Sequence, residues 1–240
     1  MKQLLTFVLS FLLGSSAQTQ SLTAPELLEK AIAYHDPDGR WATFDDTFTV
    51  IMTRPDNPER ESQIAINLPQ EHFSLETKID TVTTQYILDQ ADCQMLYQSE
   101  PIDTTAAQAV DMSCERGNMY KNYYTYLYGL PMKLRDPGTN INYPVEKKEF
   151  QGKQYLVLKA TYDAAVGSDV WYFYFDPQNY AMEVYQFYRT DDAGKMLPSS
   201  GEYVLLSEEE TINGIKMPKV RAWYYNKDDQ YLVTDTLIER

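Results

Sequence analysis

Short runs of alternating apolar and polar residues, separated by tight turns, constrain this chain of 240 residues more than any other feature. Ile64, Ile66 and Leu68 alternate with Gln63, Ala65 and Asn67. Such alternation is typical of a strand with one buried and one wet face. Further strands are expected over 47–52, 73–79, 82–88, 93–97, 155–161, 170–175, 180–189, 202–206, 220–225 and 231–238. The short connections predict an antiparallel sheet of roughly ten strands, which should curl or split because large flat open sheets are uncommon.

Turn residues place the reversals between several of these strands. Asn213-Gly214 is the strongest hairpin signal, since both positions tolerate positive φ. Asp176-Pro177-Gln178-Asn179 and the turn at 226–228 are expected to reverse the chain as well. The fold class predicted is therefore mainly β with a few helices.

Two helices are expected beside the sheet. The first begins at the capping box Thr23-Ala24-Pro25-Glu26 and ends near Tyr34 or His35, before a strong turn at 36–39. The second spans about 115–128 and ends at Gly129-Leu130-Pro131. It carries a broad apolar face, made of Met119, Tyr120, Tyr123, Tyr124 and Leu127.

The run Val170-Trp171-Tyr172-Phe173-Tyr174-Phe175 has aromatic residues on both faces of a strand. A sheet with one wet face should not show this pattern, so something must cover each face. If helices cross the concave side of a curled sheet, they enclose either an apolar cavity or a fully packed core. The candidate lining residues of such a cavity are Met119, Tyr120, Tyr123, Tyr124, Leu127, Trp171, Tyr172, Phe173 and Tyr174.

Residues 1–17 have the features of a secretory signal peptide. Lys2 supplies the positive start, residues 4–13 form an apolar run, and Ser15-Ser16-Ala17 places small residues before cleavage after Ala17. The run is shorter than the roughly 20 residues that a transmembrane helix needs. The sequence predicts a periplasmic protein, not integral to the membrane, with residues 18–240 forming a single domain.

The net charge limits the classes of binding partner, and the cysteines bear on the cellular compartment. The net charge of −14 argues against a nucleic-acid partner, because phosphate binding needs clustered Lys and Arg. Disulfides persist in the compartments that exported proteins reach. Cys93 and Cys114 are therefore expected either to form a disulfide or to remain two separate thiols.

Three segments carry a resemblance to a known family: residues 35–41 (HDPDGRW), 123–134 (YYTYLYGLPMKL) and 213–218 (NGIKMP). They resemble a family of uncharacterised exported bacterial proteins, which in turn resembles the periplasmic lipoprotein-carrier (localisation-of-lipoproteins) superfamily. The resemblance implies one half-barrel domain over 18–240, in which helices act as a lid over an apolar cavity that holds acyl chains.

No catalytic, metal or cofactor signature is present in the sequence. There are two histidines, His35 and His72, and no H-E-x-x-H, G-x-S-x-G, phosphate-loop or dinucleotide pattern. His35 is expected as a cation at a helix end and His72 as a solvent-facing side chain. We expect no enzyme, although paired carboxylates among 35 acidic residues leave a glycosidase open.

Three functions are compatible with these sequence features. The leading one is an exported binding protein for an apolar or lipid-like ligand, similar to a lipid or lipoprotein carrier. The second is a carbohydrate-binding module or glycosidase, with Trp41, Trp171 or Trp223 as stacking platforms. The third is a ligand-free interaction domain that binds other envelope proteins.

Overall fold

The computed structural model describes residues 22–238, so the predicted signal peptide at 1–17 lies outside the described residues. The helices are α1 (Ala24–His35), α2 (Thr104–Ala109) and α3 (Cys114–Tyr128), with short 3-10 helices η1 (Trp41–Thr43) and η2 (Met132–Arg135). The strands are β1 (Asp45–Thr53), β2 (Arg60–Asn67), β3 (His72–Ile79), β4 (Val82–Asp89), β5 (Asp92–Tyr97), β6 (Glu100–Pro101), β7 (Thr139–Asn140), β8 (Glu146–Phe150), β9 (Lys153–Tyr162), β10 (Val170–Phe175), β11 (Met182–Tyr188), β12 (Glu202–Ile212), β13 (Ile215–Tyr225) and β14 (Tyr231–Ile238).

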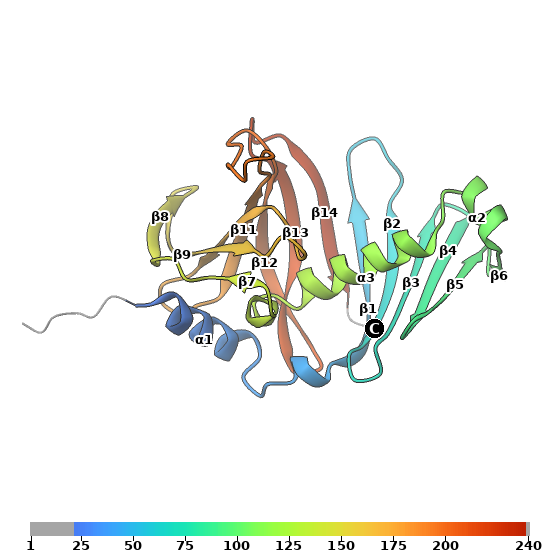
Figure 1. The fold of residues 1–240 in the computed structure, drawn as a ribbon, viewed down its shortest axis with the longest axis horizontal. Coiled ribbons are helices and arrows are strands. Elements are labelled where there is room, and N and C mark those ends of the chain that lie inside the picture. Colours follow the sequence, from blue (N-terminus) through green and yellow to red (C-terminus); the bar gives the residue numbers. More distant parts are fainter. Residues whose placement is uncertain (1–21, 239–240) are drawn as a thin grey trace, which may run out of the picture.

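The strands form one curved antiparallel sheet that is not closed into a barrel. Its order is β6-β5-β4-β3-β2-β1-β14-β13-β12-β11-β10-β9-β7, and β8 also pairs with β9. Two meanders thus meet where β1 pairs with β14. Figure 1 shows the sheet curving behind α3, which crosses its concave side. The predicted fold class is confirmed.

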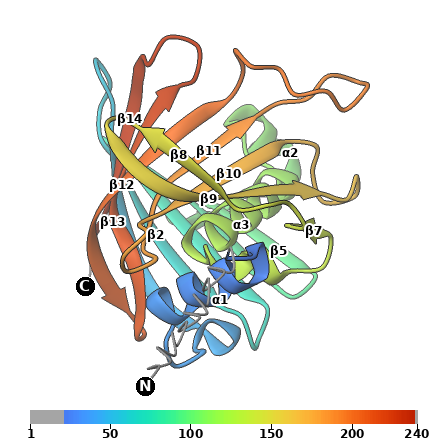
Figure 2. The same ribbon diagram turned by 90° about the vertical axis from the view of Figure 1, so that its left-hand side faces the viewer.

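The helix α1 forms where the capping box predicted it. The Thr23 side chain accepts a hydrogen bond from the Glu26 backbone, and the Glu26 carboxylate accepts one from the Thr23 backbone. The apolar stripe of the helix, Leu27, Leu28, Ala31 and Ile32, is buried against β9 and β13. Figure 2 places α1 below the end of the sheet where β8 and β9 lie.

The two faces of β10 pack in different layers, because successive side chains of a strand point to opposite sides. Trp171, Phe173 and Phe175 join the main core on the concave side. Tyr172 and Tyr174 lie on the convex side with a smaller cluster built around Tyr155, Val157 and Val184. Phe150 of β8 packs on this cluster, so that β8 supplies the cover that the second aromatic face requires.

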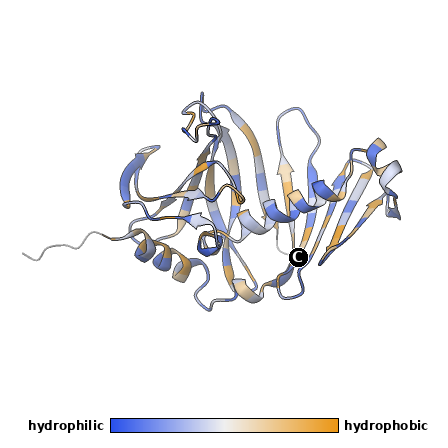
Figure 3. Cartoon of the chain, viewed as in Figure 1, coloured by the Kyte–Doolittle hydropathy of each residue, from blue (hydrophilic) through white to orange (hydrophobic). Residues whose placement is uncertain are grey.

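The helix α3 is rich in tyrosine rather than in aliphatic residues. Figure 3 accordingly colours it mostly from hydrophilic to neutral. Its buried residues are Gly117, Tyr124, Leu127 and Tyr128. A disulfide between Cys93 and Cys114, with Cα atoms 6.0 Å apart, joins β5 to the first residue of this helix. Within residues 22–238, no helix is long and apolar enough to cross a membrane.

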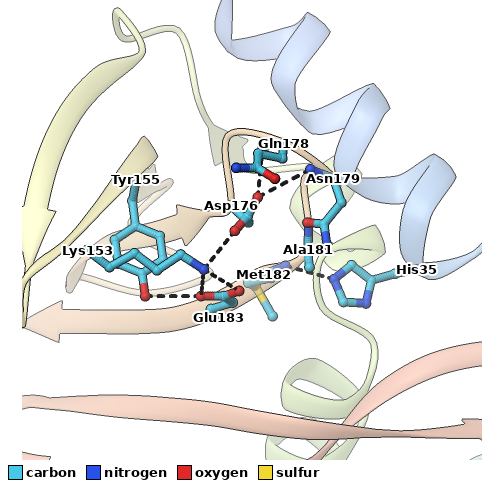
Figure 4. A network of polar contacts seen from close by, with 9 residues as sticks. All are labelled: His35, Lys153, Tyr155, Asp176, Gln178, Asn179, Ala181, Met182 and Glu183. Atoms are coloured by element: carbon cyan, nitrogen blue, oxygen red, sulfur yellow. Dashed lines mark hydrogen bonds and ion pairs between the residues drawn. The ribbon is translucent and has the colours of Figure 1, made fainter.

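His35 is buried at the end of α1, and the prediction of a cation there is wrong. The Met182 backbone N–H donates to His35 Nε2 at 2.9 Å, so Nδ1 carries the proton and donates to the Lys216 carbonyl at 2.7 Å. Burial lowers the pKa of His35. Figure 4 shows this contact beside a surface ion network in which Lys153 bridges Asp176 and Glu183.

Candidate functional site

A cavity of about 850 Å³ lies beside the C-terminal half of α3, and we name it the α3 pocket. One wall comes from the end of β2 and the start of β3, with Ile66 and Phe73. The opposite wall comes from the start of β10 and from the loop 163–169 that precedes it. The pocket therefore lies where α3 spans the space between the two meanders.

Three aromatic side chains, Tyr126, Tyr162 and Trp171, form an aromatic wall of the α3 pocket. The rings of Tyr126 and Trp171 meet edge to face, with centroids 5.6 Å apart. The hydroxyl groups of Tyr126 and Tyr162 are hydrogen-bonded to each other. Burial raises the pKa of Tyr162 to about 12 and raises that of Tyr126 well above its usual value, so both phenols remain neutral.

Charged residues surround this aromatic wall. Lys121 Nζ donates to the Glu71 carbonyl at 3.4 Å, and Lys133 forms an ion pair with Asp136. Burial raises the pKa of the Asp169 carboxyl, although the charge of Arg189 opposes the shift. An apolar wall with a charged rim suits a molecule that has an apolar body and a polar end.

Both histidine and acidic side chains occur at the rim, but they do not gather into a metal centre. His72 lines the pocket, with Nδ1 3.9 Å from Asp89 Oδ1. In the part of the chain that the structure describes, there is no group of three His, Cys, Asp or Glu side chains that could hold a metal ion.

The nine residues predicted to line a cavity lie in five different places. Trp171 lines the α3 pocket, whereas Tyr120 and Tyr124 line a second cavity of about 190 Å³ beside Arg60. Leu127 and Phe173 are buried in the main core. Met119 and Tyr123 are exposed, and Tyr172 and Tyr174 lie on the convex side of the sheet. The structure therefore brings only Trp171 of this set into the α3 pocket.

The residues that sequence reasoning missed are Tyr126, Tyr162 and the loop 163–169. Tyr126 lies in a segment in which five of six residues, 123–128, are Tyr or Leu, so the sequence does not indicate which of them turns toward a cavity. One signal was available in the loop, because Val166 is an isolated apolar residue among small and acidic neighbours. Its side chain is exposed and lines the pocket.

Comparison with known proteins gives a family and several distant structural neighbours, of which two are described. A LolA superfamily protein from Nitrosomonas europaea is 13% identical, with 91% of this chain and 93% of that chain covered and a TM-score of 0.48. A DUF1329 family protein from Desulfovibrio piger is 10% identical, with coverages of 90% and 92% and a TM-score of 0.48. No curated protein matches the chain. The model of DUF6503, a family of unknown function, matches residues 2–240, and the chain therefore belongs to that family.

Proposed function

We propose that this protein is exported and that it binds an apolar or lipid-like ligand in the α3 pocket. The observation that carries the proposal is the open cavity of about 850 Å³ with an aromatic wall and a charged rim. Small-molecule sites usually occupy about 300–1,000 Å³ and combine apolar walls with a few polar groups. The α3 pocket has both properties.

Burial of an acyl chain sets an upper limit on the affinity of such a pocket. Burial of roughly fifteen methylene groups contributes about 12 kcal/mol. Association costs at least about 4 kcal/mol in lost freedom of motion. The remainder is therefore at most about 8 kcal/mol, which corresponds to a dissociation constant no tighter than about micromolar.

The position of the three tryptophans makes binding in the α3 pocket measurable. Trp171 lines the pocket, whereas Trp41 and Trp223 are not among its lining residues. Trp41 is buried against Phe44. A fatty acid brominated in the middle of its chain, and its methyl ester, should quench tryptophan fluorescence on binding. We expect Trp171→Phe to remove most of the quenching while keeping an apolar wall, and Trp41→Phe to retain it.

Two results would contradict the proposal. One is the absence of quenching by either brominated probe, together with no lipid in an organic extract of the purified protein. The other is quenching that survives Trp171→Phe and disappears in Trp41→Phe, which would place the ligand elsewhere.

A carbohydrate-binding role, the alternative from the sequence, would need exposed aromatic platforms. Trp41 is 8% exposed and Trp223 is 7% exposed, so neither offers a face to a sugar ring. Trp171 remains as the one platform among the three tryptophans, and it lies inside the α3 pocket. The geometry therefore favours the apolar ligand over the sugar.

A further inference from the structure

Charged side chains cross the concave face of the sheet under α3. The strand register places Arg60 opposite Met52, Met52 opposite Asp235, and Asp235 opposite Arg221. Arg221 is 1% exposed and Asp235 is 6% exposed. We call Arg60, Asp235 and Arg221, together with the tyrosines Tyr128 and Tyr185 that adjoin Arg221, the polar seam.

The guanidinium of Arg221 is only partly satisfied by the protein. It lies 3.9 Å from the ring centroid of Tyr128 in α3, and its Nη1 donates to the Pro218 carbonyl at 2.8 Å. Its Nε and Nη2 have no hydrogen-bond partner among the described residues. Buried charged groups normally complete their hydrogen bonds, because an unmade bond to a charge is costly.

Two buried hydroxyl groups beside Arg221 are also available as donors. The hydroxyl groups of Tyr128 and Tyr185 have no hydrogen-bond partner in residues 22–238. Burial raises the pKa of both phenols, and the charge of Arg221 only partly opposes the shift. Both therefore keep their protons, and each can donate to an acceptor that reaches Arg221.

The charges of the polar seam do not balance. Asp235 is the carboxylate of the polar seam and faces the guanidinium groups of Arg60 and Arg221, and its Oδ2 accepts a hydrogen bond from Trp223 Nε1 at 3.1 Å. Burial raises the pKa of Asp235, against the influence of Arg60 and then of Arg221. When Asp235 is ionised, the polar seam carries a net charge of +1. When Asp235 is protonated, the net charge of the seam is +2. An added anion would compensate this charge.

The polar seam is connected to the aromatic wall of the α3 pocket through Tyr185. The ring of Tyr185 packs against that of Trp171, with centroids 6.0 Å apart. Trp171 lines the pocket, and Tyr185 adjoins Arg221. The contact between Trp171 and Tyr185 therefore links the wall of the cavity to the unpaired donors.

We infer that the ligand of the α3 pocket is an anionic amphiphile that binds with its head group inward, on Arg221, Tyr128 and Tyr185. This inference rests on the proposed function and names its ligand class. The acyl chain passes Trp171 and lies along the apolar wall, and a turn of the Trp171 or Tyr185 ring admits the head group. The head group is a carboxylate or a phosphate, since either offers the oxygens that a guanidinium and two hydroxyl groups bind.

The rim lysines define the opposite arrangement, in which the head group faces outward. Lys121 and Lys133 lie at the mouth of the pocket and could hold an anion there. The two arrangements make different predictions for variants of Arg221 and Lys121, so a binding experiment can separate them.

The test measures how well hexadecanoate, hexadecyl phosphate and hexadecanol displace a neutral fluorescent acyl probe from the protein. We expect at least one anion to bind roughly tenfold or more tighter than the neutral alcohol, because bonds to a charged group are the stronger ones. Arg221→Met should abolish this preference and leave hexadecanol binding in place. Arg135→Met, which removes an exposed cation paired with Glu29 outside the pocket, is the matched control and should keep the preference.

The variants Tyr128→Phe and Tyr185→Phe cover the case in which Arg221→Met fails to fold. Each keeps the buried ring and removes only the hydroxyl group. We expect each to weaken anion binding several-fold with no change for hexadecanol. The comparison of hexadecanoate with hexadecyl phosphate in the same series identifies the head group.

The possible failures are distinguishable. Equal affinity for the alcohol and both anions would overturn the inference and leave the proposed function standing. The inference would also be overturned if the preference for the anion survives in Arg221→Met, or in both Tyr128→Phe and Tyr185→Phe, but is lost in Lys121→Met. If the neutral probe and all three ligands fail to bind, the proposed function fails and the inference fails with it.

Discussion

At the scale of single residues, His35 shows how one buried side chain can join three parts of the fold. It is the last residue of α1, and its two ring nitrogens bond the backbones of Met182 in β11 and Lys216 in β13. The bond from Met182 requires a lone pair on Nε2, which a protonated ring lacks. The neutral form of His35 is therefore part of the folded structure.

A pH-dependent stability follows from this arrangement. Because burial lowers the pKa of His35, the unfolded chain takes up a proton near pH 6.5 before the folded protein does. The contribution of His35 is complete above that pH and decreases as the pH falls below it, with a slope of up to about 1.4 kcal/mol per pH unit. Denaturant unfolding between pH 5 and 7.5 should show this slope in the wild type and its loss in His35→Gln.

The control for this experiment is His72→Gln, whose side chain is 36% exposed at the pocket rim. We expect it to keep the wild-type slope. If wild type and His35→Gln lose the same stability between pH 7 and pH 5, the proposed role of His35 in the pH dependence is wrong.

Residue by residue, the sequence predicted local features well and side-chain direction poorly. Thr23 and Glu26 form the predicted cap, and Asn213 and Gly214 both adopt positive φ in the β12–β13 turn. The orientation of the tyrosines could not be predicted, since the 20 tyrosines include residues of the core, of the pocket wall and of the convex cluster. Tyr has an apolar ring and a polar tip, so it fits all three environments.

At the scale of elements, α3 is fixed at both ends. Ser113 caps its N-terminus, and the disulfide at Cys114 joins it to β5. At its C-terminus, Gly129 lies so close to Trp41 of η1 that a Cβ atom would come within 2.6 Å of Trp41 Cε2. The absence of a side chain at Gly129 thus permits the close packing of α3 against η1.

Gly129→Ala should therefore destabilise the protein. Trp41 has to move to accept the added methyl group, and overpacking of this kind costs about 1–3 kcal/mol. Thermal or denaturant unfolding measures the loss. Gly167→Ala is the control, since its Cβ would lie 3.9 Å from the nearest neighbouring atom, in Tyr162. Equal stability of the two variants would contradict this account of the junction.

Elements with strong local signals were predictable, and those that depend on tertiary pairing were not. The helix expected over 115–128 is α3 (Cys114–Tyr128), and the one expected to end near His35 is α1. The helix α2, over the small residues 104–109, was not predicted, although Asp103 caps it. The strands β6 and β7 have two residues each, and so short a strand has no alternation to detect.

At the scale of the whole molecule, residues 22–238 form fourteen strands where roughly ten were expected, and the curvature was predicted correctly. The two meanders meet at one strand pair, β1 with β14, which runs from Thr49–Ile238 to Thr53–Thr234. The sequence could not predict this pair, because its partners lie near opposite ends of the chain. The main hydrophobic core nevertheless includes residues from both meanders.

A proline in this central pair tests whether the two meanders unfold together. Thr236 lies between Ile51 of β1 and Val220 of β13. Thr236→Pro removes a ladder donor from an inner strand and should lower the free energy of unfolding by about 2–4 kcal/mol. Native-state hydrogen exchange should then accelerate in both meanders to the same extent.

The control for the proline variant is Glu149→Pro in β8, an exposed position next to a single partner strand. We expect a smaller loss there, because edge strands tolerate proline. Faster exchange confined to β13 and β14, with β3 to β5 still fully protected, would contradict the single cooperative domain.

The link between Cys93 and Cys114 has a consequence for how the protein should be prepared. It holds one end of α3 covalently, whereas the end beside the pocket is held by non-covalent contacts, at Tyr126, Tyr128 and Gly129. Material made where thiols stay reduced would lack the anchored end, so the helix could shift as a whole instead of pivoting about a fixed point. Ligand binding measured on oxidised and on reduced samples would then describe two molecules that differ in whether α3 is covalently attached to β5.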